Sequence, residues 1–357
     1  IEFVGARKES YSKDTRNPST SAGSFMDDML RRDFTINTLA IKLNKENFGE
    51  LIDTFGGIQD ISKKTIVTPN EPNKTFSDDP LRMLRAVRFS SQLKFNIAEK
   101  TKNSIQKNSE RLKILSPERI SDEINKILLT ESPSIGFKNL ESLNLLKFII
   151  PELIDLKGIE EVEGQTHKDN FYHTLEVLDN ISKNTDNLWL RWAALLHDIG
   201  KAPTKKFDKK IGWTFHGHEY VGSKMVKKIF KKLKLPLNET LKYVQKIVMM
   251  SSRPIIISED IVTDSAVRRL IYDAEDLIED LLTLCEADIT TKNLKKSIKY
   301  QNNFKVVRKK IKDVEKRDRI RNFQPPVTGE IIMNHYKIKP CKEIGIIKEK
   351  IKNAILD

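Results

Sequence analysis

The fold is decided by one stretch, which reads Asp78-Asp79-Pro80-Leu81-Arg82-Met83-Leu84-Arg85-Ala86-Val87-Arg88-Phe89. An aspartate directly before a proline predicts that a helix begins at Asp79. Side chains three residues apart lie on the same helix face, so we expect Asp79 and Arg82 to face the same way. Helical spacing of apolar residues continues from here through the rest of the chain. The chain therefore divides at this point into a short sheet region and a long helical body.

The residues before this stretch show the alternation typical of strands. Alternating residues predict strands over 1–6, 36–43 and 51–52. The polar segment 10–24 contains Asn17-Pro18 and Gly23, which predict a mobile loop. The pair Gly56-Gly57 predicts a turn at which the sheet ends. We therefore expect an α+β fold.

Composition limits the class of protein. With 357 residues, the chain is long enough for two or three cores. Its 63 Lys and Arg against 50 Asp and Glu give a net charge of +13, which favours a polyanionic partner such as nucleic acid. A lysine-rich chain with solvated helix faces would have the same charge. The motifs must therefore decide whether the charge indicates a nucleic-acid partner.

Cysteines and hydropathy exclude further classes. The two cysteines, Cys285 and Cys341, are far apart and lack the spacing of a zinc site or a disulfide framework. No apolar run has membrane-spanning length. We expect a soluble protein of the reducing cytoplasm with no membrane partner.

A first candidate site combines two short motifs. The segment Arg31-Arg32-Asp33-Phe34-Thr35-Ile36-Asn37 places two guanidinium groups beside a carboxylate, which suits a triphosphate. Cytosine and adenine both present an amino donor beside a ring-nitrogen acceptor, and a carboxylate next to a guanidinium complements this pair. Asp79 and Arg82 could supply those groups, and Arg85 could contact the phosphates. A capped helix with salt-bridged arginines on its solvated face remains the alternative.

The order of these motifs resembles the class II nucleotidyltransferase family, which comprises CCA-adding enzymes and bacterial poly(A) polymerases. Asp78 stands where the family's selecting motif has Glu, and residues 6–11 resemble its ARxExY segment. The resemblance implies nucleotide-binding roles for Arg31, Arg32, Asp33, Asn37, Asp79, Arg82, Arg85 and Arg88. It implies a structural motif at Asp53, Gly57, Asp60, Glu118, Arg119 and Glu123, the last three bracing a neck helix.

The family's opening motif, a phosphate-binding loop with two metal-binding aspartates, does not occur in residues 1–357. Glu2 resembles the family's third, catalytic carboxylate, and the implied cofactor is Mg²⁺. We expect a preceding segment to carry the aspartates, and we expect residues 1–357 alone to be unable to transfer nucleotides at an appreciable rate.

A second resemblance, over residues 167–288, is to HD phosphohydrolase domains. Imidazoles and carboxylates on facing helices suit a second divalent metal. The implied ligands are His173, His197, Asp198, His216, His218 and Asp288. Ser251 stands where related HD-bearing members commonly have a histidine, so one ligand is expected to be lost.

Together these resemblances imply four domains. They are part of a palm at 1–60, a helical neck and RNA-binding body at 61–150, an HD-type domain at 151–300 and a helical tail at 301–357. The implied function is template-independent addition of CCA, or A, to tRNA from CTP and ATP. A poly(A) polymerase of the same family, an HD phosphohydrolase with a vestigial palm and a silent RNA-binding protein remain alternatives. The sequence does not indicate an oligomeric state.

Overall fold

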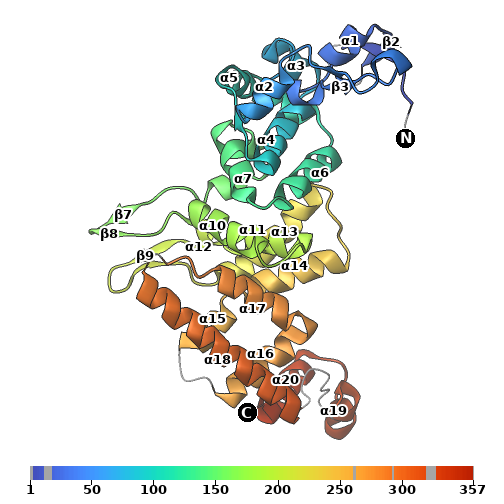
Figure 1. Cartoon of the computed structure of the whole chain (residues 1–357). Helices are drawn as coiled ribbons and strands as arrows, with labels where there is room; N and C mark the ends of the chain where they lie inside the picture. Colours follow the sequence, from blue (N-terminus) through green and yellow to red (C-terminus); the bar gives the residue numbers. More distant parts are fainter. Residues whose placement is uncertain (1–2, 12–17, 260–262, 292, 319–326, 357) are drawn as a thin grey trace.

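The computed structural model describes residues 3–11, 18–259, 263–291, 293–318 and 327–356. The protein is elongated, and its helices follow one another from the N-terminal elements at one end to α19 and α20 at the other (Figure 1). It is mostly helical with small sheets, which confirms the expected α+β class.

The N-terminal region contains short strands and helices. Strands β1 and β2 form an antiparallel hairpin that pairs Arg7 with Ala22. Its elements are β1 (Arg7–Ser10), β2 (Ser19–Ala22), α1 (Phe25–Leu30), η1 (Thr35–Asn37), β3 (Ala40–Ile41), η2 (Lys45–Asn47), β4 (Leu51–Ile52), α2 (Gly57–Ser62) and β5 (Thr65–Ile66).

Several strand predictions were wrong here. The strand expected over 1–6 lies at 7–10, and residues 3–6 are irregular. The expected loop at 10–24 contains β2, and its residues 12–17 lie outside the described part. The strand expected over 36–43 is a 3₁₀ turn followed by two strand residues. The sheet region also extends past the glycine pair, because β5 pairs in parallel with β6 (Asn96–Ile97).

The deciding stretch forms a helix as expected. Helix α3 (Pro72–Asp78) is followed by Asp79 as its C-terminal cap, and α4 (Leu81–Leu93) begins two residues after Asp79. The Asp79 carboxylate accepts a hydrogen bond from the Leu81 N–H at 3.1 Å, which satisfies a free donor of the first turn. Met83, Leu84, Ala86 and Val87 are buried on the inner face of α4. Arg82 and Arg85 therefore lie on another face of this helix.

A helical neck follows α4, and three prolines in first-turn positions start helices there. Its elements are α5 (Glu99–Asn108), η3 (Ser109–Ile114), α6 (Pro117–Leu128), α7 (Pro133–Ser142), α8 (Leu146–Ile149) and α9 (Pro151–Ile154). Helices α6 and α7 pack against α4, which fixes the wall that carries the arginines.

The middle of the molecule is a helical layer with two projecting hairpins (Figure 1). The hairpins are β7 (Glu161–Val162) with β8 (Gln165–Thr166), and β9 (Lys206–Asp208) with β10 (Gly212–Thr214). The helices are α10 (Asn170–Ser182), α11 (Leu188–Leu196), α12 (Lys201–Thr204), α13 (His218–Lys232) and α14 (Glu239–Met250). Helix α11 is buried along most of its length and forms the centre of this layer.

The C-terminal elements complete the molecule. They are α15 (Arg253–Glu259), α16 (Asp264–Ala274), η4 (Glu275–Leu277), α17 (Ile278–Ala287), α18 (Leu294–Asp318), α19 (Gly329–Tyr336) and α20 (Lys342–Leu356). One continuous hydrophobic core runs from Phe34 to Val314. None of the described helices is long and apolar enough to cross a membrane.

Candidate functional site

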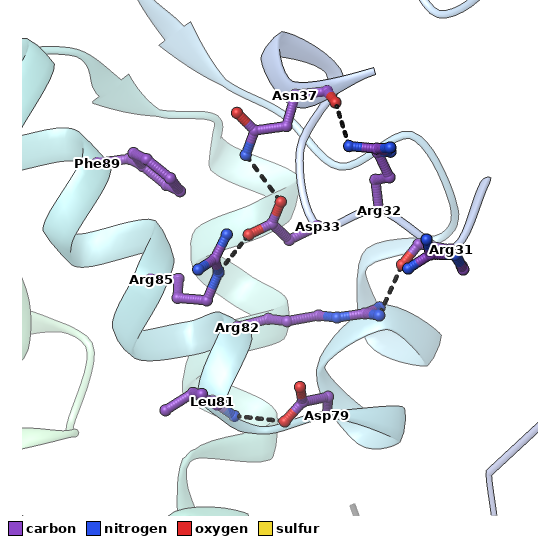
Figure 2. A pocket seen from close by; sticks show the side chains of 9 residues that line it. All are labelled: Arg31, Arg32, Asp33, Asn37, Asp79, Leu81, Arg82, Arg85 and Phe89. Carbon is purple, nitrogen blue, oxygen red and sulfur yellow. Dashed lines mark hydrogen bonds and ion pairs between the residues drawn. The ribbon is translucent and has the colours of Figure 1, made fainter. Parts of the chain in front are cut away.

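A pocket of about 510 Å³ lies where α4 faces the segment after α1 (Figure 2). Four arginines and two aspartates contribute to its wall, so the wall carries an excess of positive charge. The complete lining is Arg31, Arg32, Asp33, Asn37, Asp79, Leu81, Arg82, Arg85 and Phe89. Two segments about fifty residues apart in the chain therefore form one site.

Asp33 organises one side of the pocket. Its side chain is almost fully buried, and one carboxylate oxygen accepts a hydrogen bond from Arg85 Nε at 2.5 Å. The other oxygen accepts from Asn37 Nδ2 at 2.8 Å and from the Phe34 N–H at 3.1 Å. The buried charge of Asp33 therefore holds the side chains of Arg85 and Asn37 in fixed positions (Figure 2).

Arg82 crosses the floor of the pocket toward the segment after α1 (Figure 2). Its Nη2 donates to the Arg31 carbonyl at 2.6 Å and to the Tyr11 hydroxyl at 3.3 Å. The Tyr11 hydroxyl in turn donates to Glu9 at 2.6 Å. Burial, followed by this bond to Glu9, raises the pKa of Tyr11 well above its usual range. The tyrosine therefore stays neutral and keeps its proton.

Acidic side chains behind the pocket hold the other two arginines. Arg31 contacts Asp28 at 2.6 Å and Glu9 at 3.3 Å, and Arg32 contacts Asp28 at 3.2 Å. Burial alone would raise the pKa of Asp28, but the hydrogen bonds from Arg31 and Arg32 outweigh it and lower the pKa. The sequence motifs included Glu9 and Tyr11 only as part of the segment 6–11, without a role, and Asp28 was missed. The acid three residues before Arg31 was the available signal.

A second group of polar side chains lies in the middle layer. One ligand atom from each of His173, His197 and Asp288 lies within 4.8 Å of the others, which is close enough to hold one metal ion. His173 Nε2 is 2.8 Å and His197 Nε2 is 3.7 Å from Asp288 Oδ1. Both rings are held from behind, because His173 Nδ1 is 2.9 Å from Thr290 Oγ1 and His197 Nδ1 is 2.8 Å from the Ala194 carbonyl. Such contacts fix ring orientation in metal sites.

Asp198 lies beside this group. Its Oδ2 is 3.4 Å from His197 Nε2 and 3.5 Å from His173 Nε2, and it also accepts from Lys201 Nζ at 2.7 Å. Burial alone would lower the pKa of His197, but the charges of Asp198 and Asp288 outweigh it and raise the pKa to about 10. A bound cation would replace this proton, since imidazole must be neutral to ligate a metal.

The chain is similar to known proteins over most of its length. Residues 1–67 match the poly A polymerase head domain, residues 94–156 match the probable RNA and SrmB-binding site of polymerase A, and residues 170–293 match the HD domain. An A-adding tRNA nucleotidyltransferase of Deinococcus radiodurans is 33% identical over 270 residues, covering 73% of this chain and 59% of that protein. The chain belongs to the tRNA nucleotidyltransferase and poly(A) polymerase family.

The chain is also similar to other members of the family, in sequence and in fold. A multifunctional CCA protein of Shewanella frigidimarina is 37% identical over 217 residues, covering 59% of this chain and 50% of that protein. The chain spans between half and three fifths of the length of these curated relatives. The CCA-adding enzyme of Bacillus stearothermophilus in complex with CTP has a TM-score of 0.60 at 21% identity, covering 94% of this chain and 71% of that one. The Thermotoga maritima CCA-adding enzyme complexed with tRNA has a TM-score of 0.56 at 22% identity, covering 93% and 70%. Both share the fold.

The residues that the sequence resemblance assigned to nucleotide binding lie together, with one exception. Arg88 does not line the pocket. It faces the neck, where its Nε is 3.1 Å from Glu123 and its guanidinium lies over the Phe89 ring at 4.4 Å. Glu123 therefore braces α6 against α4, while Glu118 and Arg119 are exposed at the start of α6.

The residues of the expected structural motif at Asp53, Gly57 and Asp60 make contacts within the N-terminal region. Asp53 accepts hydrogen bonds from the N–H groups of Gly57 at 2.7 Å and Ile58 at 2.9 Å, which caps α2. Asp60 accepts from Thr35 Oγ1 at 2.6 Å. A Cβ at Gly57 would lie 2.5 Å from the Thr35 carbonyl oxygen, so only glycine fits there. The motif thus supports the segment that carries Asn37.

Two further expected ligands, His216 and His218, lie outside the group of three. His218 is 3.7 Å from Asp198, but His216 is exposed and stands outside the group of three ligands. Ser251 is buried, and its hydroxyl donates to the Val248 carbonyl at 3.0 Å within its own helix. Glu2, the expected catalytic carboxylate, lies outside the described residues.

Proposed function

We propose that the protein adds C and A, or A alone, to tRNA 3′ ends from CTP and ATP without a nucleic-acid template. The single observation that carries this proposal is that Asp79 and Arg82 line the same pocket as Arg31, Arg32 and Arg85. A carboxylate and a guanidinium would read the base edge while three further guanidinium groups hold the triphosphate.

The orientation of Arg82 supports this role. Its hydrogen bonds to Arg31 and Tyr11 use Nη2 alone among the described residues, so Nε and Nη1 remain to donate to a ring nitrogen. Each good bidentate contact to a base edge contributes about 1 to 3 kcal/mol of discrimination. Such a contact would favour cytosine and adenine over uracil and guanine.

The remaining assignments belong to the same proposal. Asp33 and Asn37 position the nucleotide, Arg88 acts as a brace, and Mg²⁺ is held with the help of Glu2. The domains are the four given by residues 1–60, 61–150, 151–300 and 301–357. The partners are tRNA, CTP and ATP, and the compartment is the cytoplasm.

A second candidate function rests on a different observation. His173, His197 and Asp288 converge beside a pocket of about 260 Å³, which suits a metal-dependent phosphohydrolase. We propose that this group binds a divalent metal. His218 and Asp198 are further candidate ligands, whereas the exposed His216 is not proposed again.

The test is incorporation of each labelled nucleotide into tRNA that lacks its CCA end, measured with Mg²⁺ and the complete gene product. Incorporation of CTP and ATP, but not UTP or GTP, supports the proposal. Long A tails on unrelated RNA from ATP alone would instead assign a poly(A) polymerase. Phosphate release without any extension of RNA would assign the phosphohydrolase.

A further inference from the structure

Helix α13 has two faces of very different composition. Gly222, Val226, Ile229 and Phe230 are buried, and they pack the helix against α14. From Lys224 onward, every exposed residue on the opposite face is a lysine. These lysines are Lys224, Lys227, Lys228, Lys231 and Lys232, followed by Lys234 directly after the helix, and all six are exposed. We call these six residues the α13 lysine face.

These lysines lack a counter-charge among the residues that the structure describes. Among the described residues, none of the six makes an ion pair, and the one acid on α13, Glu219, is engaged at the other end of the helix with Ser252. Like charges three and four residues apart repel one another, as Lys224 and Lys228 or Lys227 and Lys231 do. The arrangement therefore costs stability in the isolated protein.

Lysines on the neighbouring helices are arranged differently. On α14, Lys242 pairs with Glu239 at 2.7 Å, and Lys246 pairs with Glu275 at 2.7 Å. On α6, Lys126 pairs with Asp122 at 2.6 Å. A high lysine content alone predicts the same mixture of charges on every exposed face. Favourable interaction with the helix dipole explains Lys231 and Lys232 in the last turn, but not the lysines before them.

We propose that the α13 lysine face binds the phosphate backbone of the RNA substrate, an inference that rests on the proposed function. From Lys224 to Lys232 the face spans about 12 Å along the helix, enough to follow a few consecutive phosphates. Tyr220 is exposed one turn earlier, with Lys224 Nζ 4.0 Å from its ring centroid. A tyrosine beside a lysine row adds a ring on which a base can stack.

The position of α13 fits a long substrate. Helix α13 lies in the middle layer, beneath α6 and outside residues 94–156 that match an RNA-binding model (Figure 1). An RNA whose 3′ end occupied the arginine-lined pocket could extend along the molecule past this layer. The face would contribute affinity without sequence preference, because lysines contact phosphates and not base edges.

The test compares two triple variants for binding to a labelled tRNA transcript between about 50 and 200 mM KCl, the range in which phosphate contacts show their salt dependence. The first is Lys227→Gln with Lys228→Gln and Lys231→Gln. The matched control is Lys242→Gln with Lys246→Gln and Lys352→Gln, which removes the same charge from lysines held in ion pairs. A third variant carries arginine in place of the first three lysines. Circular dichroism and the melting temperature confirm that each variant is folded.

The first triple variant should bind tRNA at least about tenfold more weakly, with a salt slope shallower by about 2 to 3, since each lost phosphate contact removes about 0.7 to 0.9 from the slope. The control and the arginine variant should bind like the unmodified protein. Equal loss in the first variant and the control would overturn the inference, as would an unchanged slope. Lost binding to phosphatidylserine vesicles with tRNA binding unchanged would overturn it in favour of a membrane. If the unmodified protein fails to bind tRNA at all, the proposed function itself fails.

Discussion

Asp33 shows how one residue can organise a site. Its buried carboxylate accepts hydrogen bonds from Arg85, Asn37 and the Phe34 N–H, so it fixes one arginine of the pocket wall and the end of η1 together. The sequence indicated Asp33 by its place after two arginines. It could not indicate that Glu9 holds Arg31 from behind, because that contact depends on the β1 hairpin lying against α1.

At the same scale, the hydrogen bond that Asp79 accepts from the Leu81 N–H can be separated from its proposed role in reading the base edge. Replacing it by Ala removes a helix cap, at a cost of about 1 kcal/mol in the free energy of unfolding. If Asp79 also reads the base edge, Asp79→Ala should reduce the preference for CTP and ATP over UTP and GTP several-fold, while RNA affinity barely changes. Equilibrium binding of the four triphosphates measures this ratio. Asp122→Ala, an exposed acid on α6, is the control, and an unaltered ratio in folded Asp79→Ala would leave Asp79 as a cap only.

Ser251 is the second residue with a sharp expectation. Its hydroxyl is turned to its own helix backbone, so Ser251→Ala should leave metal binding intact. Asp288→Asn should abolish most of the stabilisation of the protein by Mn²⁺, because it weakens one of three converging ligands. The measurement is the stabilisation by Mn²⁺, about 2.7 kcal/mol at a hundredfold excess over Kd in the unmodified protein. Loss of that stabilisation in Ser251→Ala would show that the serine takes part in binding.

At the scale of elements, helices followed from the sequence and strands did not. The periodic apolar spacing of α4, α6 and α10 belongs to long segments, and prolines marked the starts of α6 and α9. The strands are two to four residues long, too short for alternation to distinguish them from turns. Strands β5 and β6 pair across thirty residues, a contact that no local pattern contains.

The sequence predicted most of the candidate site residues that belong to a motif, but it did not predict where Arg88 and His216 lie. Arg31, Arg82 and Arg85 were expected together and lie together. Arg88 follows Arg85 by three residues but turns to Glu123, because a glutamate on α6 faces that side of α4. His216 shares a segment with His218, yet the left-handed turn at Gly217 leaves it exposed.

One buried arginine joins neck and middle layer, and its loss should be severe. Arg191 is 2% exposed and donates to four backbone carbonyls, those of Leu128, Thr130, Ser182 and Thr185, at 2.7 to 3.1 Å. Arg191→Leu leaves these acceptors without their donor, so we expect a loss of about 3 kcal/mol or more in the free energy of unfolding. Urea denaturation measures it. Replacing the exposed Arg253 by Leu should cost under about 1 kcal/mol. Equal losses of stability in the two variants would show that Arg191 does not join the neck to the middle layer.

For the whole molecule, the arginine-lined pocket and the group at His173 lie in different layers (Figure 1). We therefore expect His197→Ala with Asp198→Ala to leave nucleotide binding at the pocket unchanged. Stability should fall by about 1 to 3 kcal/mol, because the changes remove hydrogen-bonded groups from a packed interior. Calorimetric titration with CTP and thermal unfolding measure the two effects. A variant with an unchanged melting temperature but lost CTP binding would show that the sites are coupled.

The central claim is that Asp79 and Arg82 make this pocket selective for cytosine and adenine. Its most direct test is the equilibrium affinity of the unmodified protein for CTP, ATP, UTP and GTP under one set of conditions. CTP and ATP should bind about tenfold more tightly than UTP and GTP, which corresponds to about 1.4 kcal/mol and lies within the range of one good base-edge contact. Four equal affinities would contradict it, because the pocket would then bind the triphosphate alone.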